Sequence, residues 1–179
     1  MTPVALLNHE GALNERFTGV HGTWLEPEEI TALASAGAHL CVCPTTEGDL
    51  GDGFAPTQAL FEAQVPMSVG SDSHAVIDPF AELRALEYQA RARSGSRCVL
   101  INPEGEVGPA LLKIGSQNGY AALGLPSAGD RVVIDGRSRA RDEVSDPIGA
   151  MMTAGHPGLV RRVEVAGEVV VENGRHVSC

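Results

Sequence analysis

The chain has 179 residues, with 13 Lys and Arg against 23 Asp and Glu, and so carries a formal net charge of −10. This acidic balance argues against nucleic acid or an anionic membrane as a partner, because phosphate binding depends on a basic surface. At 43% hydrophobic and 20% charged residues, the composition is typical of a globular domain and not of a disordered chain. No apolar run approaches the roughly 20 residues that span a bilayer, and the N-terminus lacks a signal-peptide pattern, so we expect a soluble, cytoplasmic protein.

The first part of the chain predicts units in which a short strand precedes a helix. The predicted strands are residues 18–21, 38–43 and 65–69. Pro27 and Pro79 stand where proline favours a first helical turn, and Asp78 is placed to cap the helix that Pro79 opens. The apolar residues of this last helix recur at near-helical spacing and predict its buried face: Phe80, Leu83, Leu86 and Ala90. Strands that alternate with helices in this way indicate parallel β/α units.

The rest of the chain has other patterns. Residues 45–53 are rich in glycine and acidic residues without the spacing of an EF-hand, and we expect a solvated loop over an active site. Residues 107–123 predict a further helical stretch. Beyond Leu125 we predict short β segments at 131–135, 160–165 and 168–171, and residues 136–158 receive no assignment. The sequence therefore divides into an α/β part, 1–125, and a small β module, 126–179.

The cysteines are Cys41, Cys43, Cys98 and Cys179, too sparse and irregular for a secreted disulfide scaffold. Cys41 and Cys43 form a Cys-x-Cys pair inside a predicted strand, whose alternation points both side chains to one face. No second pair and no nearby histidine in the sequence completes a tetrahedral zinc set. We therefore expect two buried core thiols rather than a metal site.

His21 and the segment that contains Asp72 each follow a predicted strand. In β/α architectures the carboxyl ends of parallel strands surround a common cavity where catalytic groups gather. Each residue also has a structural explanation, a satisfied histidine for His21 and a helix cap for Asp72. Asp78, six residues later, is the better-placed cap, so capping does not require Asp72. These two residues are the candidate catalytic pair.

The strand-end motifs, taken in order, resemble the C-terminal half of the amidohydrolase superfamily, most of all its N-formimino-L-glutamate deiminases. The motifs are Val20-His21-Gly22-Thr23, Cys43-Pro44-Thr45-Thr46-Glu47 with Leu50-Gly51-Asp52-Gly53, and Val69-Gly70-Ser71-Asp72-Ser73-His74. The resemblance extends over nearly the whole chain and is weakest at 136–158. It implies a metal-dependent (β/α)8 barrel of the TIM type with a small β-sandwich, and one divalent metal, usually zinc.

The resemblance also implies roles for particular residues. His21 matches the sixth-strand histidine that polarises the substrate and stabilises the tetrahedral intermediate. Asp72 matches the eighth-strand aspartate, which is a metal ligand and takes a proton from the metal-bound water. Ser73 and His74 lie beside this ligand and are expected to bind substrate. The implied reaction is deimination of N-formimino-L-glutamate to N-formyl-L-glutamate and ammonia, in histidine degradation.

The sequence departs from the family pattern in its metal ligands. The family has a His-x-His pair on the first strand and a metal-binding histidine on the fifth, and this sequence contains no His-x-His. We interpret the chain as the C-terminal part, strands six to eight of the barrel with part of the sandwich. A catalytic zinc takes about three protein ligands, and the sequence identifies only Asp72, so we expect weak zinc binding and no turnover from this chain alone.

Several alternatives stay open. One is another deaminase of the same superfamily, acting on guanine, an aminopyrimidine or a triazine. Another is a non-catalytic fragment that complements a separately encoded N-terminal half, and a third is a non-functional remnant. The expected partners are a small-molecule substrate, such a half, or a second copy in a homodimer of the complete enzyme. Arg84, Arg91 and Arg93 are predicted to be solvated rather than to bind substrate.

Overall fold

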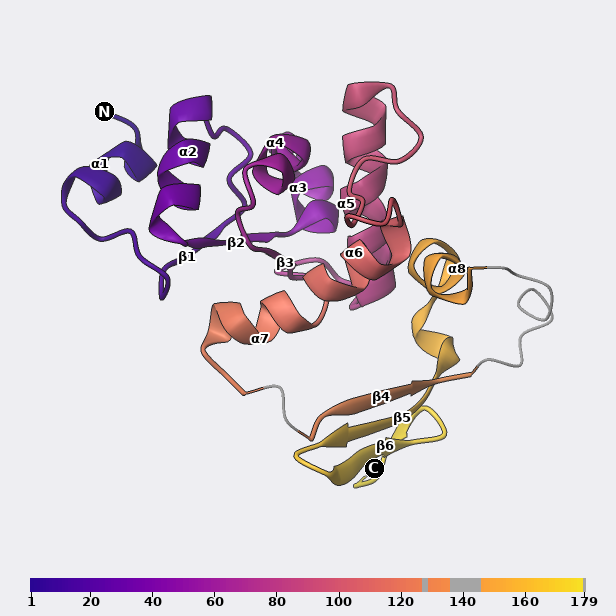
Figure 1. Ribbon diagram of the computed structural model, residues 1–179. Coiled ribbons are helices and arrows are strands. Elements are labelled where there is room, and N and C mark those ends of the chain that lie inside the picture. Colours follow the sequence, from indigo (N-terminus) through magenta and orange to yellow (C-terminus); the bar gives the residue numbers. More distant parts are fainter. Residues whose placement is uncertain (127–128, 136–145, 179) are drawn as a thin grey trace.

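The computed structural model describes residues 1–126, 129–135 and 146–178. In this part of the chain the strands form a three-stranded sheet in the order β1-β2-β3 and a four-stranded sheet in the order β4-β5-β6-β7. Figure 1 shows the first sheet among helices α1 to α5 and the second sheet below α6 and α7. The three-stranded sheet is built from residues 18–69 and the four-stranded sheet from residues 131–176.

The first sheet is parallel, as predicted. Its strands are β1 (Thr18–Val20), β2 (His39–Val42) and β3 (Met67–Val69). Thr18 pairs with His39, and Leu40 pairs with Met67. The helices around these strands are α1 (Pro3–His9), α2 (Pro27–Ala36), α3 (Pro44–Leu50), α4 (Thr57–Glu62) and α5 (Pro79–Ser94). Because the strands are parallel, the residues that follow β1 and β3 leave the sheet at the same edge.

The ends of α5 follow the local signals in the sequence. The Asp78 carboxylate accepts hydrogen bonds from the backbone N–H groups of Phe80 and Ala81 at 2.9 and 3.1 Å, and Pro79 opens the helix. Gly95 ends it in the left-handed region at φ 70°, where a residue without a Cβ is favoured. The four apolar residues predicted to face the core are all buried. The prediction of this helix is confirmed.

Helix α3 corrects the prediction of a solvated loop at 45–53. Pro44 occupies its first turn, and Gly51 ends it at φ 70°. Thr46 and Glu47 are buried and pack against the protein, whereas residues 48–52 are exposed, so the segment is solvated only in its second part. The threonines, glycine and aspartate of this segment have low helix propensity, but tertiary contacts compensate: Thr45 N–H donates to Glu82 Oε2 on α5 at 3.1 Å.

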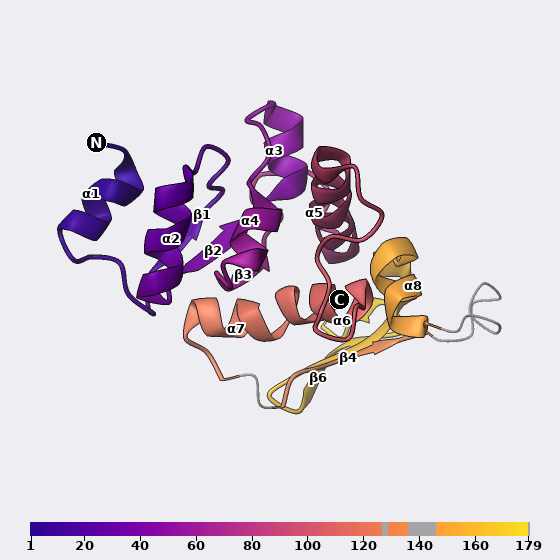
Figure 2. The same cartoon turned by 45° about the horizontal axis from the view of Figure 1, so that its top comes forward.

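The predicted helical stretch 107–123 is two helices, α6 (Val107–Ile114) and α7 (Gln117–Leu123), which are separated at Gly115 and Ser116. A Cβ on Gly115 would lie 2.7 Å from Leu83 Cδ1, so a larger residue there would displace this side chain of α5. Helix α7 contacts the starts of two strands of the parallel sheet. Asn118 Nδ2 donates to the Met67 carbonyl at 2.8 Å, and Thr18 Oγ1 donates to the Ala122 carbonyl at 3.0 Å. In Figure 2, α7 lies between the two sheets.

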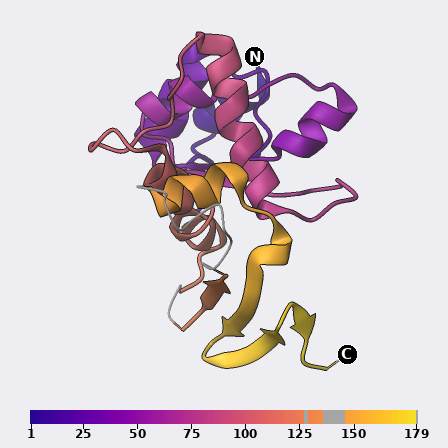
Figure 3. The same cartoon turned by 90° about the vertical axis from the view of Figure 1, so that its right-hand side faces the viewer.

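The second sheet is antiparallel and confirms the predicted β segments. Its strands are β4 (Arg131–Ile134), β5 (Val160–Val165), β6 (Glu168–Glu172) and a short β7 (Arg175–His176). Strand β5 pairs with both β4 and β6. Figure 3 shows β5 and β6 extending away from the helices.

Part of the segment that received no assignment is helical. It contains α8 (Pro147–Ala154), followed by a short 3-10 helix, η1 (Pro157–Leu159), whereas residues 136–145 lie outside the described residues. Asp146 caps α8 by accepting from Gly149 N–H at 2.8 Å. A Cβ on Gly108 of α6 would lie 2.5 Å from the backbone nitrogen of Gly149, so the two helices touch closely. Helix α8 thus returns from the β module to the α/β part.

Of the three arginines predicted to be solvated, Arg93 is exposed as predicted, whereas Arg84 and Arg91 are half-buried, and all three make contacts within the protein. Arg84 donates to the carbonyls of Thr153 and Gly155 at 3.3 and 3.1 Å, which ties α5 to the end of α8. Arg91 donates to Glu87 at 2.7 Å, and Arg93 donates to the Phe54 carbonyl at 2.8 Å. They contribute to the packing of α5, and in the described residues they make no contact with His21 or Asp72.

The helices of residues 1–126, 129–135 and 146–178 include none with the length and hydropathy of a membrane-spanning segment.

Candidate active site

His21 leaves the carboxyl end of β1 through an unusual backbone conformation. Its N–H still donates to the Cys41 carbonyl of β2 at 2.8 Å, but its φ is +71°. Positive φ is uncommon for a residue with a side chain and often accompanies function. The next residue, Gly22, has φ +68°, and a Cβ there would lie 2.8 Å from Leu25 Cδ1. This turn places the His21 side chain, which is 40% exposed, at the carboxyl edge of the sheet.

Asp72 lies in the loop after β3 and also has a positive φ, 47°. Thr46 Oγ1 on α3 donates to the Ser71 carbonyl at 2.8 Å and fixes this loop against the helix. The Asp72 carboxylate is 41% exposed, and its Oδ2 lies 3.7 Å from His21 Nε2. The structure therefore brings the two predicted strand-end residues together, and Asp72 caps no helix because Asp78 has that role.

Glu47 on α3 holds the imidazole from the other side. Its Oε1 lies 3.2 Å from His21 Nδ1 and accepts the Cys43 backbone N–H at 2.8 Å. The residue is fully buried, and within the described residues its Oε2 has no hydrogen-bond partner. Burial raises the pKa of Glu47, although the hydrogen bonds from Cys43 and His21 lower it in part. A neutral His21 that donates Nδ1–H to Glu47 presents the lone pair of Nε2 toward Asp72.

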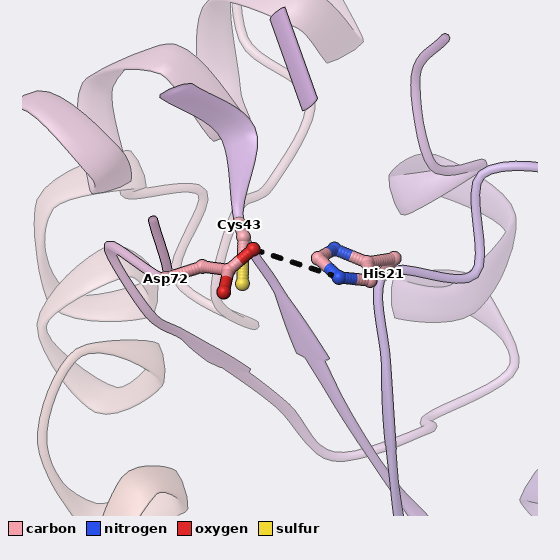
Figure 4. A group of neighbouring side chains, drawn as sticks. All are labelled: His21, Cys43 and Asp72. Carbon is pink, nitrogen blue, oxygen red and sulfur yellow. Dashed lines mark ion pairs between the residues drawn. The ribbon is translucent and has the colours of Figure 1, made fainter. Parts of the chain in front are cut away.

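The thiol of Cys43 completes a group of three donor atoms. One ligand atom each from His21, Cys43 and Asp72 lies within 4.8 Å of the others, and Figure 4 shows the three side chains converging. Burial, together with the charges of Cys41, Glu47 and Asp72, raises the pKa of Cys43 to about 12. Imidazole nitrogen, cysteine sulfur and carboxylate oxygen are the ligands that zinc takes in proteins. The residues present therefore fit a divalent metal of this kind.

Cys43 is buried, as the sequence predicts, but the expectation that no histidine lies near it is wrong. Cys41 is half-buried. The nearby histidine that the sequence did not reveal is His21, which comes from the neighbouring strand. Glu47 was also missed as a site residue. The signals for Glu47 are its place at the end of the Cys43-Pro44-Thr45-Thr46-Glu47 motif and its position four residues after Cys43, one turn into a helix that the sequence did not predict.

Ser73 and His74 lie beside Asp72 in the chain but outside this group of donors. Ser73 is exposed, and His74 Nδ1 lies 3.2 Å from both the backbone nitrogen and the carbonyl oxygen of Val76. Their role in substrate binding stays a prediction.

A parallel β/α sheet with polar ligands at the carboxyl ends of its strands defines a class of α/β enzymes in which loops at that edge carry the chemistry. Residues 1–170 match the amidohydrolase family, and the chain belongs to this family. It is 34% identical to the formimidoylglutamate deiminase of Pseudomonas aeruginosa, over 97% of this chain and 41% of that protein. It is 28% identical to a 5-methylthioadenosine/S-adenosylhomocysteine deaminase of Pyrococcus furiosus, over 99% of this chain and 43% of that protein.

Solved structures agree with this assignment. An amidohydrolase from Brucella melitensis superposes with a TM-score of 0.87 at 34% identity, over 98% of this chain and 40% of that chain. An adenosine deaminase from Xanthomonas campestris with bound zinc superposes with a TM-score of 0.89 over 100% of this chain and 42% of that chain. At 24% identity the second likeness concerns the fold alone. The chain thus spans about two-fifths of the length of the relatives it matches.

Proposed function

We propose that this chain carries part of the active site of an amidohydrolase-superfamily deaminase that converts N-formimino-L-glutamate and water to N-formyl-L-glutamate and ammonia. The observation that carries the proposal is the approach of His21 Nε2 to Asp72 Oδ2, 3.7 Å apart, at the carboxyl edge of a parallel sheet. The 34% identity to a formimidoylglutamate deiminase favours this substrate. A deaminase of adenine nucleosides is the second candidate, supported by 28% identity to a methylthioadenosine deaminase.

In the proposed architecture β1, β2 and β3 are strands six, seven and eight of a (β/α)8 barrel of the TIM type. The antiparallel strands β4 to β7 then form part of the small β-sandwich. Support comes from the parallel strand order and from the position of His21 and Asp72 directly after the outer strands. The chain spans 41% of the Pseudomonas protein. We propose that further strands of the barrel complete the site and that the partner of the complete enzyme is a small-molecule substrate.

The proposed chemistry divides between the metal and the side chains. A divalent metal, with zinc the natural choice for these ligands, would supply a water whose pKa is lowered to about 7. Asp72 would help to hold the metal, accept a proton from the attacking water and deliver it to the departing nitrogen. Water would add to the formimino carbon, with its first proton carried by Asp72 to the imino nitrogen. As the hydroxyl group becomes a carbonyl, its proton would pass to the same nitrogen, the C–N bond would break and ammonia would leave.

His21 and Glu47 act on orientation and charge in this scheme. A protonated His21 presents Nε2–H toward the substrate and stabilises the charge that develops at the attacked carbon's substituents. Glu47 accepts from Nδ1 and so fixes the plane of the ring, because the buried carboxylate is itself held by the Cys43 N–H. Glu47 is therefore a positioning residue.

A chimera tests the proposal directly. The matching part of the Pseudomonas deiminase would be replaced by this chain, and ammonia release would be followed with N-formimino-L-glutamate and with 5-methylthioadenosine. We expect release from the first substrate and a loss of at least about 100-fold in the Asp72→Asn chimera. Asp49→Asn, an exposed aspartate on α3, is the matched control and should retain activity.

Preference for 5-methylthioadenosine would support the second candidate. A folded chimera without activity on either substrate would contradict both, and circular dichroism would establish the folding. The 179-residue chain alone is expected to release no ammonia.

A further inference from the structure

We propose that His21, Cys43 and Asp72 together form a divalent-metal site within this chain, in which Cys43 Sγ is a ligand beside His21 Nε2 and the Asp72 carboxylate. The inference rests on the proposed function, in which Asp72 is the only residue of this chain named as a metal ligand, and it adds His21 and Cys43 to the ligands. It concerns metal binding by this chain and does not depend on which substrate the complete enzyme takes.

The distances favour a tetrahedral ion. Zinc bonds of about 2.0–2.3 Å place the ligand atoms of a tetrahedral site about 3.3–3.6 Å apart. His21 Nε2 and Asp72 Oδ2 are already 3.7 Å apart, and the donor atoms of the three residues lie within 4.8 Å of one another. Closing the group around an ion takes movements of about 1 Å. The half-exposed side chains of His21 and Asp72 have room for such movement.

In the free chain, a neutral His21 would also favour a cation at this position. When His21 donates Nδ1–H to Glu47, the Nε2 lone pair faces a carboxylate oxygen, and two acceptors then oppose each other. A histidine that ligates a metal almost always donates its other ring N–H to a carboxylate or carbonyl, which orients the ring and raises its basicity. Glu47 fills this role for His21, and the same oxygen accepts the backbone N–H of Cys43. One buried carboxylate thus positions two of the three ligands.

Cys43 and Cys41 are distinguished by position. Cys41 lies on β2 and Cys43 directly follows this strand. A Cβ on Gly70 would lie 3.3 Å from Cys41 Sγ and 3.5 Å from Cys43 Sγ, so Gly70 makes room for both sulfurs. In the described residues only Cys43 belongs to the group with His21 and Asp72. When the metal–sulfur bond forms, the thiol loses its proton to the solvent, and a thiolate selects zinc, cobalt or cadmium over magnesium or calcium.

A metal held in this way has a consequence for activity. With Nε2 bound to the metal, His21 cannot direct that nitrogen to a substrate. The chain alone should then bind one metal ion and still release no ammonia, whereas the rest of the barrel would have to supply other ligands before His21 is free for the reaction.

Cobalt is the probe for the test. The purified, size-fractionated 179-residue chain would be titrated with Co²⁺, and we expect one ion per chain with thiolate-to-cobalt charge-transfer absorption in the near ultraviolet. Cys43→Ser should abolish this band. Cys41→Ser and the exposed Cys98→Ser are matched controls and should retain it. Absence of the band from the unchanged chain, or its loss in either control, would overturn the inference.

X-ray absorption of the zinc-loaded unchanged chain makes the test independent of how Cys43→Ser folds. One sulfur neighbour at about 2.3 Å is expected beside nitrogen and oxygen neighbours, and nitrogen and oxygen alone would overturn the role of Cys43. That result would leave the proposed role of Asp72 intact. A sulfur-ligated metal in this chain, combined with an inactive chimera, would overturn the proposed function and leave this metal site standing.

Discussion

The two sheets of this protein differ in how far they are covered. In the parallel sheet Leu40, Val42 and Met67, which share one face, are buried in the core, whereas Val20 on the opposite face is 54% exposed. In the antiparallel sheet the described strands contain no buried residue, and Val132 and Val133 are 58% and 47% exposed. Burial of apolar side chains in the parallel sheet therefore contributes more to the free energy of folding than burial in the antiparallel sheet. The candidate site lies at the carboxyl edge of the parallel sheet.

The junction between the two regions is open rather than tightly packed. A cavity of about 640 Å³ lies between the antiparallel sheet and the helices. Its lining includes Phe80 of α5, Leu112 of α6, Leu123 of α7, Met151 of α8 and Val163 of β5. The antiparallel sheet contacts apolar side chains of these helices but leaves part of their surface uncovered. Substitutions in the two regions should accordingly differ in cost, from the core of the parallel region to the surface of the antiparallel one.

The largest effect is expected at Leu86, a fully buried residue of α5. Leu86→Ala removes buried methyl groups and leaves a cavity, so the free energy of unfolding should fall by about 2–5 kcal/mol. Urea denaturation followed by circular dichroism measures this loss. A change below about 1 kcal/mol would show that the parallel region is not the packed core that its burial indicates.

A slightly smaller effect is expected at Glu87, whose buried carboxylate joins α5 to the segment that follows it. It accepts from the backbone N–H groups of Val99 and Leu100 at 3.1 and 3.0 Å and from Arg91 Nε at 2.7 Å. Glu87→Gln replaces one acceptor oxygen by an NH₂ group and should cost about 1.5–3 kcal/mol. Glu104→Gln, at an exposed position, is the control that should leave the urea midpoint unchanged.

Glu29 on α2 should give a pH-dependent effect. Burial by itself raises the pKa of Glu29, but hydrogen bonds from the Thr2 hydroxyl and from backbone N–H groups at the starts of α1 and α2 outweigh it and lower the pKa below its ordinary value of 4.5. A carboxyl group with a lowered pKa in the folded state stabilises the protein fully above its unfolded pKa. This stabilisation is lost as the pH falls through the folded pKa.

Glu29→Gln should therefore cost about 1 kcal/mol at pH 7 and progressively less as the pH falls below 4.5. Urea unfolding at pH 7 and at about pH 3 compares the two conditions. Glu28→Gln, an exposed position in the same helical turn, controls for the loss of a charge near the helix N-terminus. An equal cost of Glu29→Gln at both pH values would contradict the assignment.

The smallest effect is expected in the antiparallel sheet. Val132→Thr on β4 places a hydroxyl group on an exposed strand position and should change the free energy of unfolding by less than about 0.5 kcal/mol. The matched variant is Val42→Thr on β2, where the same hydroxyl would be buried without a ready partner and should cost about 1–3 kcal/mol. An equal loss of unfolding free energy in the two variants would contradict the difference in burial between the two sheets.

The elements that could be predicted from the amino-acid sequence are those with local signals. Asp78 and Pro79 specify the start of α5 because a side-chain acceptor and a fixed φ act within one turn. Alternation and strand–helix order identified the parallel units and the later β segments. Helices α3 and α8 were not identified, because their stability comes from contacts with α5 and α6 that lie far along the chain. The resemblance at the strand ends also identified the family, which the comparison confirms.

Which side chains meet at the candidate site follows from the three-dimensional packing of the chain. His21 and Asp72 were selected from their positions after strands, and parallel pairing then brought them to the same edge. That Cys43 and Glu47 join them depends on the register between β1 and β2, on the left-handed turn at His21 and on the burial of α3. These are distances across neighbouring elements, and they follow from packing rather than from spacing along the chain.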